Sequence, residues 1–290
     1  MKKFTTILIA LLMTACLVAG CAAPAATPEP AAPVATPEPA PQEPAPTPEP
    51  EPVELIVFAA ASMTETMTQI ADLYKAVAPN VTIVYNFDSS GTLKTQIQEG
   101  ADCDLFISAA QKQMNELDSS KDATVNPDAL DFVLQGTRLN LLENKVALVV
   151  PEGNPKSIVS FADIANCDLI ALGNSDVPVG QYSIEILTNL GLLEGLEKAK
   201  KISYGTNVKE VTTQVSEASV DCGIVYATDA FSAGLAVADL ATADMCKQVI
   251  YPAAVLNVSK QQDAAKAFLA YLQSPDALAV FEGVGFAPAA

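Results

Sequence analysis

Short apolar runs alternate with amphipathic segments from residue 53 to the end of the chain. The apolar runs predict β-strands, and the segments with apolar residues at three- and four-residue spacing predict helices. Strands are predicted at Leu55–Ala59, Val81–Tyr85, Leu105–Ser108, Val146–Val150, Leu169–Leu172, Ile202–Tyr204, Gly223–Tyr226 and Val249–Val258. Helices are predicted at Met63–Ala78, Thr92–Glu99, Gln111–Leu117, Gln181–Leu190, Val208–Ala218, Asp263–Gln273 and Asp276–Phe281.

This alternation of strands and helices predicts an α/β fold with mainly parallel sheets flanked by helices. The folded part is long for a single sheet, so we expect two lobes. The chain is expected to leave the first lobe near residues 140–145 and to return near residues 250–252. Lobe 1 is therefore predicted to comprise 53–142 and 252–290, and lobe 2 to comprise 143–251.

The first predicted strand runs into small residues and stops at Ser62, where a helix is expected to begin. Ser62 and Glu65 have the S-x-x-E spacing of a capping box, and Asn207 and Glu210 repeat that spacing. Free backbone N–H groups and the positive end of the helix dipole meet at such a junction, which favours an anion. A single serine in this position more often serves only as a helix cap.

The same arrangement recurs along the chain. Polar or small residues stand at predicted helix starts in residues 86–93, 176–180 and 205–210, and the strand at 223–226 ends in the phenol of Tyr226. Each stretch taken alone is more often a capped helix or a core strand than a site. Together they predict a cleft lined with neutral hydrogen-bond donors, beyond the carboxyl ends of the strands.

The N-terminal segment predicts export. Two lysines precede an apolar stretch over residues 7–18 that is too short to span a membrane, which indicates a signal peptide over residues 1–20. That segment ends in Val-Ala-Gly-Cys, which resembles a bacterial lipobox and predicts lipidation of Cys21; ordinary secretion is the alternative. Residues 21–52 are rich in Ala, Pro, Thr and Glu, which predicts an extended tether that holds the folded part away from the membrane.

Composition excludes several kinds of partner. The formal net charge of −18 predicts that the protein repels nucleic acid and anionic membrane surfaces. A bound anion would need local donors. The chain has no histidine, which removes the commonest general base and metal ligand. Four scattered cysteines, Cys103, Cys167, Cys222 and Cys246, form no C-x-x-C motif. We predict free thiols, although an exported protein could pair them.

A series of short motifs then occurs in a fixed order: VFAAASMT (57–64), NFDSSGTLKTQI (86–97), DLFISAAQKQM (104–114), DVPVG (176–180), TNVKE (206–210), GIVYATDA (223–230) and GFAP (285–288). In these motifs the chain resembles the molybdate-binding proteins of bacterial ABC transporters, which have the two-lobed periplasmic-binding-protein fold. The resemblance covers about residues 53–288. It implies a receptor that delivers its ligand to an ABC permease and its ATPase. Together with the lipobox, we expect a monomer that is lipid-anchored on the outer face of the cell membrane.

The resemblance also implies the binding residues. The oxyanion is expected in the cleft between the lobes, held by neutral donors without a metal or a cofactor. Ser62 and Ser90 are expected to donate their hydroxyl and backbone N–H groups. Val179 and Val208 are expected to donate backbone N–H groups only, and Tyr226 its phenolic O–H. The family often has alanine where Val179 stands, and this larger side chain could narrow the pocket.

Molybdate, a dianion that only accepts hydrogen bonds, suits a site made only of donors, and tungstate is nearly the same size. Sulfate or another small anion is an alternative ligand. Ferric iron is disfavoured because Tyr226 is the only phenol in these stretches. A serine hydrolase is also disfavoured, since the chain has neither histidine nor a G-x-S-x-G elbow. We therefore expect a binding protein and no enzyme.

Overall fold

The computed structural model describes residues 50–289. The predicted signal peptide over residues 1–20, the predicted lipidation site Cys21 and the tether up to residue 49 lie outside the described residues. Among the described residues, no helix is both long and apolar enough to cross a membrane.

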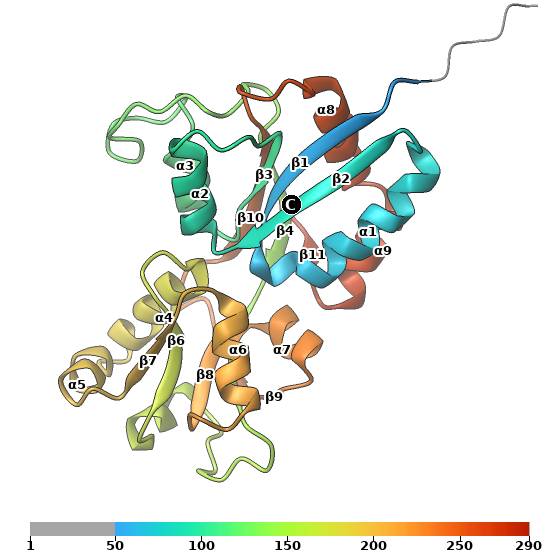
Figure 1. Cartoon of the computed structure of the whole chain (residues 1–290). Helices are drawn as coiled ribbons and strands as arrows, with labels where there is room; N and C mark the ends of the chain where they lie inside the picture. Colours follow the sequence, from blue (N-terminus) through green and yellow to red (C-terminus); the bar gives the residue numbers. More distant parts are fainter. Residues whose placement is uncertain (1–49, 290) are drawn as a thin grey trace, which may run out of the picture. The chain divides into compact units, whose positions relative to one another are not determined.

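The first sheet has six strands in the order β11-β4-β10-β3-β1-β2 (Figure 1). Its strands are β1 (Val53–Ala60), β2 (Val81–Asp88), β3 (Leu105–Ile107), β4 (Leu139–Asn144), β10 (Val249–Val255) and β11 (Ala287–Pro288). The helices that accompany it are α1 (Thr64–Val77), α2 (Ser90–Gln98), α3 (Gln111–Asn115), α8 (Gln262–Tyr271) and α9 (Pro275–Gly283), with a short 3-10 turn, η1 (Ala61–Met63), before α1. The apolar face of α1 buries Met67, Ile70 and Tyr74, as its spacing predicted.

The second sheet has five strands in the order β7-β6-β8-β5-β9. Its strands are β5 (Val146–Val150), β6 (Ile170–Gly173), β7 (Ile202–Gly205), β8 (Cys222–Tyr226) and β9 (Ala236–Leu240). Its helices are α4 (Pro178–Asn189), α5 (Leu193–Lys198), α6 (Val208–Ser216), α7 (Ala227–Ala233) and the 3-10 helix η2 (Phe161–Asn166). Strands β5, β6 and β8 are buried along their whole length, which explains their continuous apolar sequences.

The predicted α/β class with two sheets is confirmed, but both sheets are mixed and not mainly parallel. β1 pairs in parallel with β2 and β3, and β6 with β7 and β8. β10 is antiparallel to β3 and β4, and β5 is antiparallel to β8 and β9. The antiparallel pairs arise because the chain changes sheets along strands, without a helical crossover, so parallel geometry is not required there.

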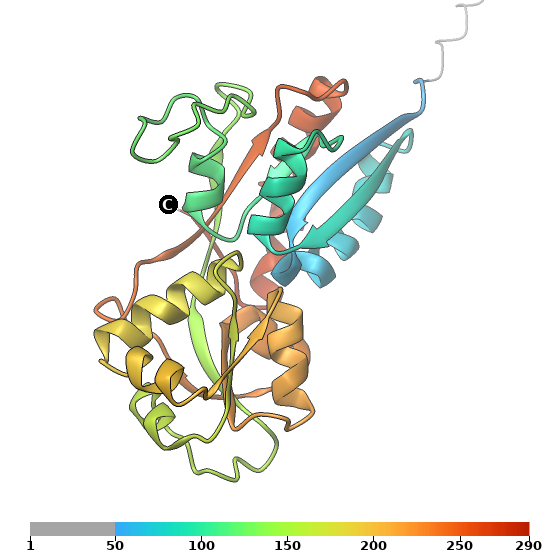
Figure 2. The same ribbon diagram turned by 60° about the vertical axis from the view of Figure 1, so that its left-hand side comes forward.

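The change of sheet takes a single residue. β4 ends at Asn144 and β5 begins at Val146, so Lys145 alone separates the two strands. Figure 2 shows the chain of β4 running directly on into β5. β10 lies antiparallel beside β4, with Tyr251 opposite Leu142, and carries the chain back into the first sheet. The division into lobes at 142/143 and 251/252 stays a prediction; β4 and β10 are continuous across these positions.

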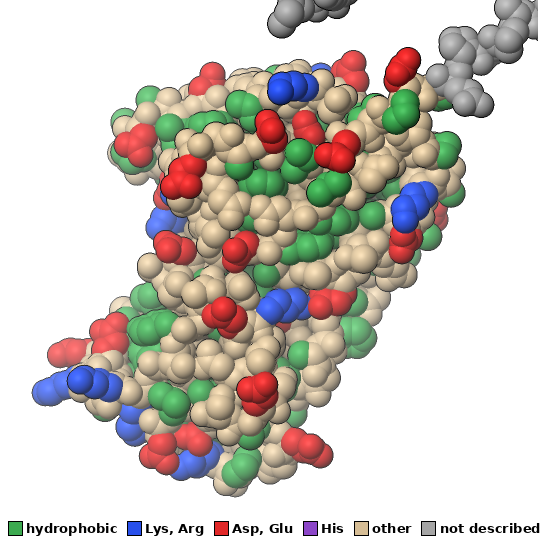
Figure 3. Space-filling view, viewed as in Figure 1, with side chains coloured by type: hydrophobic (Ala, Val, Ile, Leu, Met, Phe, Trp, Pro, Cys, Tyr) green, Lys and Arg blue, Asp and Glu red, His purple; other side chains and the backbone are tan. Residues whose placement is uncertain are grey.

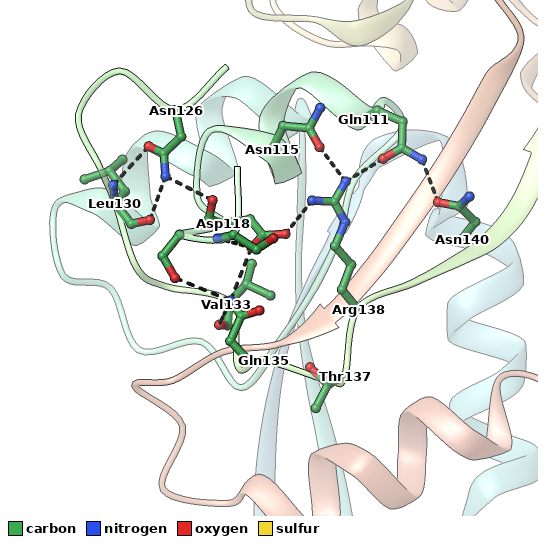
Figure 4. Close-up of polar contacts among 12 residues, drawn as sticks. Gln111, Asn115, Asp118, Asn126, Leu130, Val133, Gln135, Thr137, Arg138 and Asn140 are labelled. Carbon is green, nitrogen blue, oxygen red and sulfur yellow. Dashed lines mark hydrogen bonds and ion pairs between the residues drawn. The ribbon is translucent and has the colours of Figure 1, made fainter. Parts of the chain in front are cut away.

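The long connection between α3 and β4 is organised by polar side chains (Figure 4). Asn126 accepts a hydrogen bond from the Leu130 N–H and donates to the carbonyls of Asp118 and Leu130. Arg138 pairs with the Asp118 carboxylate at 2.7 Å and also donates to Asn115. These contacts give the segment between α3 and β4 a fixed course with little regular secondary structure.

Candidate functional site

The predicted helix starts are present at all four positions. Ser90 is the first residue of α2, and Val208 is the first residue of α6. Val179 is the second residue of α4, and Ser62 is the second residue of the 3-10 turn η1. Backbone N–H groups in the first turn of a helix have no intrahelical acceptor and carry the positive end of the helix dipole. All four residues therefore bring backbone donors to positions just beyond the ends of strands.

Four of the five predicted binding residues line one cavity. Ser62 and Ser90 come from the first sheet and its helices, and Val208 and Tyr226 come from the second. The remaining lining residues are Ala60, Ala61, Asp88, Ser89, Ala109, Val177 and Pro178. The cavity is small, about 10 Å³, which is space for about one water-sized sphere. Val179 is fully buried in the first turn of α4 and does not line the cavity, although its two preceding neighbours do.

The predicted capping box at Ser62 is wrong. The 3-10 turn η1 intervenes before α1, so Met63 occupies the N-cap position and no side chain caps the helix. The Ser62 hydroxyl instead lies 2.9 Å from the phenolic oxygen of Tyr251. Glu65 binds Lys209. The Ser62 side chain is therefore not used up by its own helix.

The predicted capping pair at Asn207 is present in a modified form. The Asn207 side chain accepts a hydrogen bond of 3.1 Å from the Glu210 N–H, as a helix cap does. Glu210 reaches back to the N–H of Thr206 and not to that of Asn207. Together these bonds fix the loop that presents the Val208 N–H.

The Ser90 and Tyr226 hydroxyls meet at Ala109. The Ser90 Oγ accepts a hydrogen bond of 2.9 Å from the Ala109 N–H, which leaves the serine's own proton free to point elsewhere. The Tyr226 hydroxyl donates a bond of 3.3 Å to the Ala109 carbonyl oxygen. Burial raises the pKa of Tyr226 well above its usual 10, so the phenol keeps its proton and remains a donor.

Two contacts near the cavity join helices of the two sheets. The Gly91 N–H, in α2, donates a bond of 3.0 Å to the Asp176 carbonyl oxygen, just before α4. A Cβ on residue 91 would overlap that carbonyl oxygen, so the approach requires glycine. Lys209, in α6, binds both carboxylate oxygens of Glu65, in α1, at 2.8 and 2.9 Å. Neither the close approach at Gly91 nor the Lys209–Glu65 pair was predicted from the sequence.

Asp229 is a buried acid that the sequence analysis also missed. Neither of its carboxylate oxygens accepts a hydrogen bond, and the Lys209 Nζ lies 3.4 Å away. Burial raises the pKa of Asp229 to about 7, although the positive charge of Lys209 acts in the opposite direction. The motif GIVYATDA contains this residue, but the pattern alone did not distinguish it from a surface acid.

The electrostatics of the cavity are unusual for an anion site. Its lining includes one acid, Asp88, and no lysine or arginine. An Asp88 carboxylate oxygen accepts a hydrogen bond of 2.7 Å from the Ser89 N–H. Acidic side chains also outnumber basic ones on the face that Figure 3 shows. Any anion bound here is held by oriented neutral dipoles.

The described residues form neither a metal-binding cluster nor a disulfide. They contain no cluster of three or more His, Cys, Asp or Glu side chains that could hold a metal ion. The cysteines in this part of the chain, Cys103, Cys167, Cys222 and Cys246, are buried and free. The Sγ atoms of Cys167 and Cys222 lie 3.6 Å apart.

An α/β chain with two sheets and a donor-lined cavity between them defines a two-lobed binding protein of the periplasmic type. Residues 55–287 match the family described as bacterial extracellular solute-binding protein, and the chain belongs to that family.

Relatives of known name agree with this assignment. The molybdate-binding protein ModA of Haemophilus influenzae is 36% identical over 243 residues, covering 80% of this chain and 89% of ModA. A Bacillus subtilis protein provisionally named the ABC transporter substrate-binding lipoprotein YvgL is 36% identical over 236 residues, covering 81% and 86%. The solved periplasmic molybdate-binding protein of Azotobacter vinelandii has a TM-score of 0.70 at 22% identity, covering 81% of this chain and all of that one, and shows the shared fold.

Proposed function

We propose that this protein captures molybdate outside the cytoplasm and delivers it to an ABC transporter. The observation that carries the proposal is the convergence of neutral donors from both sheets on one cavity. Ser62, Ser90, Val208 and Tyr226 line it, and the lining includes no basic side chain. The names of the Haemophilus and Bacillus relatives support the ligand and the transporter respectively.

The donor roles follow from what each group can offer. The Ser62 and Ser90 hydroxyls, the Tyr226 phenol and the N–H groups at the four helix starts each have a proton to donate. Molybdate is a tetrahedral dianion without a proton, so every one of its oxygens accepts. A hydrogen bond to a charged group contributes roughly 1.5–3 kcal/mol, and five to seven such bonds support binding tighter than micromolar, even after desolvation. Val179 would contribute its backbone N–H.

The size of the cavity has a consequence for binding. The cavity has room for about one water-sized sphere and a tetrahedral oxyanion is larger than that, so its entry requires the walls contributed by the two sheets to move apart slightly. The 3.3 Å bond from Tyr226 to Ala109 is the longest of the bonds that hold the lining side chains. Breaking it frees the phenolic proton for the anion. Binding is therefore coupled to a small hinge motion, as in other two-lobed receptors.

The setting of the protein is also part of the proposal. Export through the signal peptide 1–20, lipidation at Cys21 and the tether over 21–52 would hold the receptor on the outer face of the cell membrane. The mature protein is proposed to act as a monomer, with lobe 1 formed by 53–142 and 252–290 and lobe 2 by 143–251. Its partners would be the permease and the ATPase of the transporter, with no nucleic acid.

Tungstate is proposed as a second ligand because it matches molybdate in charge and nearly in size. Sulfate or another small anion is the alternative function. Asp88 favours that alternative in one respect, because a carboxylate in the lining can accept a proton carried by an anion such as hydrogen phosphate. Hydrolysis by a serine nucleophile is the least favoured function, because the chain contains no histidine to act as base.

The donor roles are tested by calorimetric titration of variants with sodium molybdate. Ser90→Ala and Tyr226→Phe should each weaken binding by about 10- to 100-fold, because each removes one charge-assisted hydrogen bond. Val179→Ala keeps the backbone donor and should change the dissociation constant by less than about threefold. The exposed serine at position 219 provides the matched control, as Ser219→Ala should bind like the parent. Parent-like binding by both Ser90→Ala and Tyr226→Phe would remove the assigned site.

A further inference from the structure

Behind Ser62, three buried polar groups form a hydrogen-bonded chain that leads away from the cavity. The Ser62 Oγ lies 2.9 Å from the Tyr251 hydroxyl. That hydroxyl lies 3.2 Å from the Asn144 side-chain nitrogen, which donates to it. The exposed fractions of Ser62, Tyr251 and Asn144 are 5, 0 and 7% respectively. Of these three residues only Ser62 lines the cavity, so Tyr251 and Asn144 can act on a ligand only through the serine.

The backbone fixes the orientation of the Asn144 amide. The Lys145 N–H donates a bond of 2.8 Å to the Asn144 Oδ1. With the oxygen held in this way, the Nδ2 group faces the Tyr251 hydroxyl and the Thr228 hydroxyl, 2.8 Å from the latter. The opposite orientation would set the side-chain nitrogen against the Lys145 N–H, two donors facing each other. Asn144 is therefore a donor to Tyr251.

The direction of the remaining bond follows from counting protons. The Tyr251 hydroxyl has one proton, and it already accepts from Asn144. The Ser62 Oγ is the one acceptor found within hydrogen-bond distance of it in residues 50–289. A buried hydroxyl proton without an acceptor is costly, so Tyr251 donates to Ser62. Ser62 is then the acceptor in that pair, and its own proton is free to point into the cavity.

Edge contacts hold the Tyr251 ring in this position. Its centroid lies 5.7 Å from that of Tyr226 and 5.2 Å from that of Phe286, both in edge-to-face geometry. The chain of bonds also sits where the polypeptide changes sheets, because Asn144 ends β4 and Tyr251 lies in the antiparallel partner β10. The groups that orient Ser62 are thus attached to the connection about which the two sheets would move.

We propose that Tyr251 and Asn144 are positioning residues that hold the Ser62 hydroxyl as a hydrogen-bond donor and thereby determine selectivity against protonated oxyanions. The inference rests on the proposed anion-binding function. A serine hydroxyl by itself can donate or accept, so residue type alone does not make the site donor-only. With Tyr251 donating to it, Ser62 has its own proton free for the cavity and one of its two lone pairs engaged. An anion that carries a proton then meets a donor at Ser62, which disfavours it relative to an unprotonated anion.

Two conservative substitutions change the hydrogen bond between Tyr251 and Ser62 in different ways. Tyr251→Phe keeps the ring and removes the proton donated to Ser62. Asn144→Asp keeps the shape but replaces the donor by an acceptor, so the Tyr251 proton turns towards residue 144. Ser62 then donates to Tyr251 and presents a lone pair to the cavity. The added negative charge of Asn144→Asp weakens the binding of every dianion. The informative quantity is therefore the ratio of the affinities for molybdate and hydrogen phosphate.

The experiment compares sodium molybdate with sodium hydrogen phosphate by calorimetry in mildly alkaline buffer, using the parent and the variants. Tyr251→Phe should weaken molybdate binding by about 3- to 10-fold and lower the molybdate-to-phosphate affinity ratio by at least about threefold. Asn144→Asp should lower that ratio by about tenfold or more. Tyr85→Phe is the matched control, because it removes a phenol that donates to the Met67 carbonyl outside the site. It should leave the ratio unchanged.

A double-mutant cycle separates positioning from general stability. If Tyr251 acts through Ser62, Tyr251→Phe should have less than about a twofold effect on molybdate affinity in a Ser62→Ala background. Provided that the parent binds molybdate, two results overturn the positioning roles and leave the proposed function intact. One is an equal effect of Tyr251→Phe in both backgrounds. The other is a molybdate-to-phosphate affinity ratio that the variants leave unchanged. Failure of the parent to bind either anion overturns both. If Asn144→Asp does not fold, the cycle with Tyr251→Phe still decides the question.

Discussion

Asp229 gives the sharpest prediction about stability and pH. The residue is 1% exposed, and its carboxylate oxygens accept no hydrogen bond. Burial raises its pKa from the usual 3.8 to about 7. At 1.36 kcal/mol for each pKa unit, this difference corresponds to about 4 kcal/mol. The folded protein holds the proton more tightly than the unfolded chain, so this stabilisation is complete below the usual pKa of 3.8 and is lost as the pH rises through about 7.

Asp229→Asn removes the titration and keeps the shape. Lys209 keeps its partner Glu65 at 2.8 Å, so the variant does not leave that lysine without a counter-charge. Urea unfolding of the parent and the variant at about pH 5 and at about pH 8 measures the effect. Relative to the parent, the variant's free energy of unfolding should rise by about 2.5 kcal/mol from about pH 5 to about pH 8. Asp72→Asn, at an exposed carboxylate paired with Lys75, should show no such gain. Parallel pH profiles for the parent and Asp229→Asn would refute the reasoning.

Three further predictions concern other contacts. Asp118→Asn should lower the free energy of unfolding by about 2 kcal/mol at neutral pH and by little near pH 2, measured in urea. The reason is that burial would raise the pKa of Asp118, but hydrogen bonds from Ser120, Arg138 and Gln135 hold it at about 2. Gly91→Ala should weaken molybdate binding by about tenfold or more in a titration, because the added methyl group prevents the close approach of α2 and α4. Because the Sγ atoms of Cys167 and Cys222 lie 3.6 Å apart, oxidised glutathione should convert the two thiols into one disulfide and release reduced glutathione. Mass spectrometry would show the loss of two hydrogens and no bound glutathione.

The elements that could be predicted from the sequence are those that are buried along their whole length or on one regular face. β5 and β8 are fully buried and read as continuous apolar runs, and α6 buries Val208, Val211 and Val215 at helical spacing. β9 was missed because it is an edge strand with a largely exposed sequence. β4 was expected only as the strand-like crossing out of the first lobe near residues 140–145, because its Leu-Asn-Leu-Leu-Glu-Asn pattern alternates poorly. Pattern alone also could not show that the sheets are mixed, since the direction of a strand depends on its partners.

The site divides in the same way. Helix starts after strands are local features, so the stretches that contain Ser90 and Val208 were predicted from the sequence pattern. The family resemblance singled out these two residues, and both line the cavity. The capping role of Ser62 was mistaken because a single 3-10 turn, invisible in the spacing, displaces it from the helix cap. Tyr251 and Asn144 were missed because their roles depend on contacts that are distant in sequence, which no local pattern records. Tyr251 contacts Ser62 across 189 positions, and Asn144 contacts Thr228 across 84 positions.

The direct test of the central claim is calorimetric titration of the purified protein with molybdate, tungstate, sulfate and hydrogen phosphate in turn. We predict one-to-one binding of molybdate and tungstate with dissociation constants below about a micromolar, weaker binding of sulfate, and still weaker binding of hydrogen phosphate. Tight binding of hydrogen phosphate, or no binding of molybdate, would contradict a site made of hydrogen-bond donors for an unprotonated dianion.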